Sequence, residues 1–124
     1  NKMARARDEE LVKAFSELQE KVTETAQKIK LADLQIESLK RSKQRAELTI
    51  AEVANLPANT KTYESVGRMF LLDDIASIKS GLQTRIKTVD EKVATLENNK
   101  TKLAQNLQES KDSIREMVQQ KQNK

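Results

Sequence analysis

The sequence has no cysteine, histidine or tryptophan, and its 124 residues include one proline, two glycines and three aromatic residues. Without cysteine it can form neither a disulfide framework nor a thiolate zinc site. Without histidine it can hold no imidazole-bound metal and no nucleophile–histidine catalytic pair. It has no glycine-rich phosphate loop, and its paired acidic residues are adjacent, so they diverge on a helix. We therefore expect no enzymatic activity, no metal site and no cofactor.

The chain also has only a small excess of one charge, because 23 basic and 19 acidic residues give a net charge of +4. The two signs are interspersed along the chain, which is typical of a solvated helix surface and not of a nucleic-acid-binding patch. The longest apolar run, Met69–Leu72, is too short to cross a bilayer. Residues 1–10 lack the apolar core of a signal peptide. These features predict a cytosolic or nuclear protein that binds neither nucleic acid nor membrane.

What the sequence does have is helix-forming composition, since Ala, Glu, Lys, Leu and Arg fill 61 of 124 positions. Two stretches carry apolar residues at alternating steps of three and four, the a and d positions of a coiled coil, which we call the seam. Nine of eleven seam residues are apolar in the first stretch: Leu11, Phe15, Leu18, Val22, Thr25, Ile29, Ala32, Ile36, Leu39, Lys43 and Ala46. Eight of ten are apolar in the second: Ile86, Val89, Val93, Leu96, Lys100, Leu103, Leu107, Ser110, Ile114 and Met117.

The two seams predict a long antiparallel two-helix coiled-coil hairpin, provided that the chain turns between them. One register pairs Phe15 with Met117, so that the residue numbers of partners add to 132. A shift of one heptad makes them add to 125 and pairs Thr25 with Lys100, and the sequence does not decide between the two. The two seam lysines, Lys43 and Lys100, are expected to set register or pairing, since long stems can reach water from such positions.

Local signals divide this hairpin into shorter elements. Thr49 followed by Glu52 reads as a capping box, which predicts a break near Leu48–Thr49 and a short helix that ends before Pro57. We therefore expect a mainly α fold in one domain over 1–124, with a coiled-coil helix at 8–48, a short helix at 49–56, a single β-hairpin at 60–73 and a coiled-coil helix at 74–120.

The β-hairpin is predicted because residues 60–72 are rich in β-branched and aromatic residues, with a glycine in the middle. We expect strands at about 60–66 and 68–73 and a turn around Gly67. A lone two-stranded hairpin is marginal in water, so partner subunits would complete it. The alternative is an apolar linker packed on its own helices. The candidate subunit-assembly residues are Tyr63, Val66, Gly67, Met69, Phe70, Leu71 and Leu72.

Residues 56–70 read Leu-Pro-Ala-Asn-Thr-Lys-Thr-Tyr-Glu-Ser-Val-Gly-Arg-Met-Phe. This window resembles the β-class subunits of prefoldin, the class with one hairpin, and residues 30–37 and 114–117 extend the resemblance. It implies a heterohexamer of two α-class and four β-class subunits, with a β-barrel platform and six coiled-coil tentacles. It further implies capture of non-native proteins, notably actin and tubulin, and their delivery to the cytosolic chaperonin without nucleotide. The basic segment 1–7 has no counterpart in the family.

Hairpin geometry places both chain termini at the end far from residues 60–72. If that end frays, its apolar residues would form a small exposed patch, and such patches mark binding sites. Alternatively, these residues only close the last heptad. The candidate client-binding residues are Met3, Leu11, Val12, Phe15, Ile114, Met117 and Val118.

Two competing functions remain open at this point. One is a coiled-coil scaffold without client binding, and the other is a tubulin-binding helical protein. Neither gives a reason for the unusual composition of residues 63–72.

Overall fold

The computed structural model describes residues 2–55 and 65–122, and it describes side chains within 2–55 and 75–122. The described residues form two long helices, α1 (Lys2–Ala54) and α2 (Ser65–Gln122). α1 contains neither glycine nor proline, so neither of the two strongest helix breakers interrupts it. The predicted mainly helical fold with two long helices is confirmed.

The predicted break at Leu48–Thr49 is wrong, because α1 is continuous through this point to Ala54. The Thr49 hydroxyl donates a hydrogen bond to the carbonyl of Arg45, at 2.9 Å, one turn earlier in the same helix. Threonine can bond back in this way from inside a helix, so its side chain does not cap a new one. The prediction that the helix ends before Pro57 is confirmed.

The predicted β-hairpin is not found. Residues 65–73, which were expected to complete one strand and supply the other, lie in the first turns of α2. Arg68, Met69 and Leu71 have high helix propensity. A helix also satisfies its backbone hydrogen bonds within one segment, whereas a two-stranded hairpin leaves both outer edges unpaired. Residues 56–64, the remainder of the predicted hairpin window, lie outside the described residues.

Both helices begin earlier than expected. α1 starts at Lys2 instead of residue 8, since Ala4, Arg5, Ala6 and Arg7 are strong helix formers. α2 starts at Ser65 instead of residue 74 and ends at Gln122, close to the expected residue 120.

The chain divides into two compact units. Unit 1 consists of Asn1–Leu34 and Leu96–Lys124, and unit 2 of Gln35–Thr95. Each unit takes a part of α1 and a part of α2, because a pair of helices makes contacts only between segments that are level with each other.

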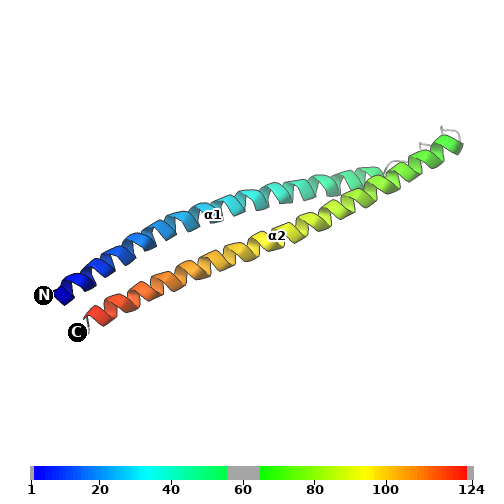
Figure 1. Cartoon of the computed structure of the whole chain (residues 1–124). Coiled ribbons are helices and arrows are strands. Elements are labelled where there is room, and N and C mark those ends of the chain that lie inside the picture. The colour runs from blue at the N-terminus through cyan, green and yellow to red at the C-terminus, as the bar shows by residue number, and fades with distance from the viewer. Residues whose placement is uncertain (1, 56–64, 123–124) are drawn as a thin grey trace. The chain divides into compact units, whose positions relative to one another are not determined.

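In unit 1, the two helix segments run in opposite directions, and both chain termini lie at one end (Figure 1). Contacts between them join Asp8 to Lys121, Lys21 to Ser110 and Asp33 to Lys100. This order matches the register that pairs Phe15 with Met117. The register shifted by one heptad is excluded, because it would place Lys100 opposite Thr25, about two turns of α1 from Asp33.

Unit 2 has the same arrangement of two antiparallel helix segments, as the colours of α1 and α2 show in Figure 1. Lys43 on α1 contacts Asp90 on α2 at 2.8 Å. The register in this unit therefore also agrees with the one that pairs Phe15 with Met117.

The predicted seam is the core of both units. All ten seam residues of α2 are buried or half-buried, as are nine of the eleven in α1. The exceptions are Phe15 and Val22, both in unit 1. The buried apolar residues are Ala32, Ile36, Ala46, Val89 and Ile114. Thr25, a polar residue, is buried as well.

Candidate functional site

The end of unit 1 that carries both chain termini brings together residues from opposite ends of the sequence. We call it the terminal end and define it as residues 2–18 and 111–122. An ion pair between the Asp8 carboxylate and the Lys121 ammonium joins the first turns of α1 to the last turn of α2. All seven candidate client-binding residues therefore lie at this one end, as hairpin geometry predicted.

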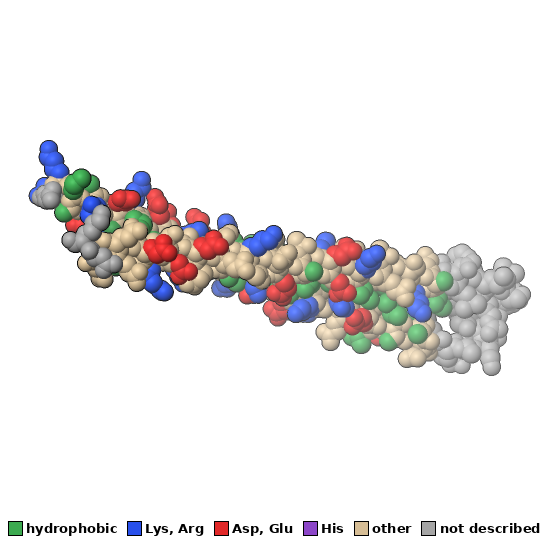
Figure 2. Space-filling model, turned by 90° about the horizontal axis from the view of Figure 1, so that it is seen from below, with side chains coloured by type: hydrophobic (Ala, Val, Ile, Leu, Met, Phe, Trp, Pro, Cys, Tyr) green, Lys and Arg blue, Asp and Glu red, His purple; other side chains and the backbone are tan. Residues whose placement is uncertain are grey.

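The seven residues divide into an exposed and an enclosed group. Met3, Val12 and Phe15 on α1 are exposed, and Val12 and Phe15 expose 68% and 48% of their surface. Leu11, Met117 and Val118 are half-buried, and Ile114 is buried. Green apolar side chains reach the surface at this end in Figure 2, beside charged ones. The enclosed residues close the last heptads, and the exposed residues form an apolar surface on α1.

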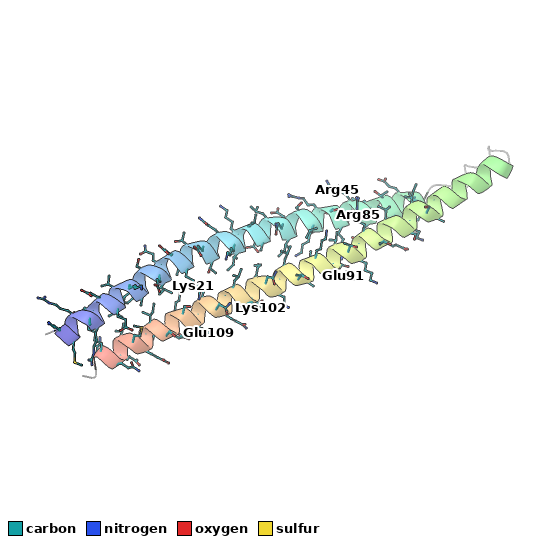
Figure 3. All side chains as sticks on the ribbon, viewed as in Figure 1. Lys21, Arg45, Arg85, Glu91, Lys102 and Glu109 are labelled. Carbon is teal, nitrogen blue, oxygen red and sulfur yellow. The ribbon has the colours of Figure 1, made fainter. Side chains whose placement is uncertain are left out.

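Phe15 is the informative member of this group, because its seam position predicts burial. Its exposure, together with that of Val22 one heptad later, shows that the seam is incompletely covered in this part of unit 1. Lys21, labelled on α1 in Figure 3, lies between these two residues in the sequence. Its ammonium donates a hydrogen bond to the Ser110 hydroxyl at 2.5 Å. In the observed register Ser110 lies opposite Val22, so a polar cross-link replaces apolar packing at that level, and Phe15 lies exposed one heptad earlier.

The candidate assembly residues are less completely placed. Tyr63 lies outside the described residues. The backbone of Val66, Gly67, Met69, Phe70, Leu71 and Leu72 lies in α2, and their side chains are not among those described. Their role in assembly stays a prediction.

Further exposed apolar residues were not selected from the sequence. Leu31 and Leu34 lie on α1 in unit 1 and expose 57% and 54% of their surface, and Leu48 and Ile78 are exposed in unit 2. The signal that identifies such residues is a large aliphatic side chain outside the alternating three-and-four spacing of the seam. Leu31 and Leu34 lie three residues apart on α1, the spacing that Val12 and Phe15 also have. Leu48 and Ile78 lie on different helices, and single exposed apolar residues are common on protein surfaces.

Each seam lysine forms an ion pair with an aspartate on the other helix. The Lys43 ammonium lies 2.8 Å from Asp90 and 4.0 Å from Glu47. The Lys100 ammonium lies 2.5 Å from Asp33 and 3.9 Å from Glu97.

These ion pairs shift the titration of both lysines. Hydrogen bonds to Asp90 and Asp33 raise the pKa of Lys43 and of Lys100, respectively, above the ordinary value of 10.5, and partial burial opposes the shift. The neighbouring Glu47 and Glu97 raise the pKa of the lysines further.

The direction of these shifts predicts how stability depends on pH. Because the folded-state pKa is raised, the lysine contribution is fully present below the unfolded pKa of 10.5 and is lost as pH rises through the folded value. Lys43→Gln/Lys100→Gln should lower the Tm by a small, constant amount between about pH 7 and 10, and the difference should shrink at higher pH. Thermal unfolding followed by circular dichroism measures this difference. The control Lys28→Gln/Lys102→Gln, at exposed positions outside the seam, should show no such convergence.

No group of three or more His, Cys, Asp and Glu residues that could hold a metal ion occurs in the part of the chain that the structure describes. Within residues 2–55 and 65–122, neither helix is long and apolar enough to cross a membrane.

Known proteins provide an independent comparison. The family described as "Prefoldin subunit" matches residues 16–121. Prefoldin subunit 1 of Tetraodon nigroviridis is 51% identical over 94% of this chain and 95% of its own length. Prefoldin subunit 1 of Homo sapiens is 48% identical over the same shares, and that of Arabidopsis thaliana is 32% identical over 91% of this chain and 88% of its own. No solved structure matches. The family match covers most of the chain, from residue 16 to residue 121, and the chain therefore belongs to the prefoldin family of co-chaperone subunits.

Proposed function

We propose that the chain is one β-class subunit of an ATP-independent, cytoplasmic prefoldin heterohexamer with two α-class and four β-class subunits. In this complex it captures non-native proteins, such as actin and tubulin, and delivers them to the cytosolic chaperonin. The observation that carries the proposal is the exposed apolar surface of Met3, Val12 and Phe15 at the terminal end. Membership of the prefoldin family supports it.

The terminal end suits a client that lacks a fixed shape. Non-native chains expose apolar side chains, and covering apolar surface contributes roughly 25 cal/mol per Å². The exposed Val12 and Phe15 lie one helical turn apart and present one continuous patch. Met3 and Met117 add flexible thioether side chains, which adapt to irregular partners. The neighbouring Asp8–Lys121 pair keeps the surroundings of the patch polar.

Assembly with the other subunits is assigned to Tyr63, Val66, Gly67, Met69, Phe70, Leu71 and Leu72. Apart from the seams, residues 63–72 have the highest concentration of large apolar residues in the chain, including two of its three aromatic residues. Apolar residues grouped in this way are typical of obligate subunit interfaces.

Client capture is tested by site-specific cross-linking in the assembled complex. A probe on this chain reports the contacts of this subunit and not those of the other five. The chain has no native cysteine, so Ser16→Cys carries a photo-cross-linker at one defined, exposed position next to Val12 and Phe15. We expect this probe to label denatured actin. Adding Val12→Ser/Phe15→Ser should reduce labelling by about tenfold, because the two lost apolar contacts are together worth more than 1.4 kcal/mol.

The matched control changes apolar residues of similar exposure elsewhere in unit 1. Leu31→Ser/Leu34→Ser, read by the same probe at Ser16→Cys, should leave labelling unchanged. Equal labelling with and without Val12→Ser/Phe15→Ser would refute the client-binding role of the terminal end. A complex that assembles but labels no client would favour a scaffold.

A further inference from the structure

The seam is interrupted by two lysines in a reciprocal arrangement. In unit 2, Lys43 of α1 reaches across to Asp90 of α2. In unit 1, Lys100 of α2 reaches across to Asp33 of α1. Each aspartate lies four residues from a seam position of its own helix, Ile29 for Asp33 and Ile86 for Asp90, so both pairs use the same heptad geometry.

These contacts are poorly suited to raising stability. Both lysines keep part of their side-chain surface in water, 34% for Lys43 and 26% for Lys100, and both aspartates are exposed. Exposed ion pairs contribute little to stability. Apolar residues at the same seam positions would pack better, whereas a lysine at an a position specifies register at a cost in stability.

Slipping the helices by one heptad would break both pairs. In one direction, Lys100 would meet Ala26 in place of Asp33, and Lys43 would meet Gln83 in place of Asp90. In the other direction, Lys43 would meet Glu97, but Lys100 would meet Lys40, placing two positive charges together. The apolar seam residues change little in either slip, because leucine, isoleucine and valine recur at every heptad.

We propose that the Lys43–Asp90 and Lys100–Asp33 pairs are the register lock of this hairpin, one in each unit. Apolar packing holds the two helices together, and the lock selects which heptads face each other. The lock thereby fixes which residues of α1 and α2 meet at the terminal end. It also disfavours parallel association of two copies of this chain, in which Lys43 would face Lys43 and Lys100 would face Lys100.

The register can be read directly with cysteine pairs, because the chain has no cysteine of its own. Ile29→Cys/Leu103→Cys reports the observed register. Ile29→Cys/Leu96→Cys and Ile29→Cys/Ser110→Cys report a slip of one heptad in each direction. A disulfide forms only where the two Cβ atoms approach closely. In a glutathione buffer, its yield therefore measures the population of each register.

The decisive variant is Lys43→Leu/Lys100→Leu, which completes the apolar seam and should fold. We expect a higher Tm than that of the native chain. At the same time, we expect roughly a tenfold rise in disulfide yield from a slip reporter, or a larger mass by light scattering. A merely stabilising role of the lysines would instead predict a lower Tm with the register unchanged.

A second variant keeps the lock but exchanges its charges. Asp33→Lys/Lys100→Asp should retain the disulfide of the observed register, whereas Asp33→Lys alone should increase slip. The proposal is overturned if the leucine variant forms only the Ile29→Cys/Leu103→Cys disulfide at the mass of the native chain. It is also overturned if the charge-exchanged variant slips as much as Asp33→Lys alone.

Discussion

A chain carrying Phe70→Asp and Leu72→Asp will keep its helical content but will not enter the proposed prefoldin hexamer. In the proposed assembly surface, two carboxylates would carry a desolvation cost that no added contact offsets. Light scattering after mixing with α-class and β-class partner subunits should show the native chain in a hexameric complex and the variant outside it. Circular dichroism should give similar helix signals for the two chains, because the seams are untouched.

The matched control places aspartate at two exposed apolar positions outside this window. Leu48→Asp/Ile78→Asp changes the same number of residues and adds the same charge, and both positions lie in unit 2. This control should assemble normally. Normal assembly of Phe70→Asp/Leu72→Asp, or equal loss in both variants, would show that residues 63–72 are not the specific assembly surface.

The second large effect is a loss of stability when a buried seam residue is truncated. Ile36→Ala will lower the free energy of unfolding by about 2–4 kcal/mol, because Ile36 is only 5% exposed and its truncation leaves a cavity between the helices. A two-helix pair takes most of its stability from such contacts, so this loss is a large fraction of the total. Urea denaturation followed by circular dichroism measures the change.

An identical substitution in the same unit provides the comparison. Ile78 is 49% exposed, and Ile78→Ala should change stability by less than about 1 kcal/mol, partly because alanine is the better helix former. Similar losses from Ile36→Ala and Ile78→Ala would mean that the seam does not dominate the stability of unit 2.

Much of the fold was predictable because the seam is a local property of the sequence. The spacing of Leu18, Ile29 and Ile36 fixes which face of α1 is apolar, whatever that face contacts. The exposed positions of Phe15 and Val22 were not predictable in this way, because their spacing is that of core residues. Their exposure depends on what α2 places opposite them: in the observed register Met117 lies opposite Phe15, and Ser110, which accepts a hydrogen bond from Lys21, lies opposite Val22.

Two local signals were misleading for physical reasons. Thr49 and Glu52 match a capping box, but the Thr49 hydroxyl has an equally good acceptor in the carbonyl of Arg45 inside a continuing helix. Residues 65–73 combine one β-branched and one aromatic residue, Val66 and Phe70, with good helix formers, and their conformation is helical. Propensity is a weak prior where the two tendencies are balanced.

The sequence by itself determined two long helices, their apolar faces, the absence of cysteine and histidine chemistry, and the resemblance to prefoldin. Only the tertiary structure decided the register, the exposure of Phe15 and the partners of Lys43 and Lys100. The physical reason is that heptad spacing repeats along the chain and so permits several alignments of one helix on the other. Choosing among them requires contacts such as Asp33 with Lys100, between residues that are far apart in sequence.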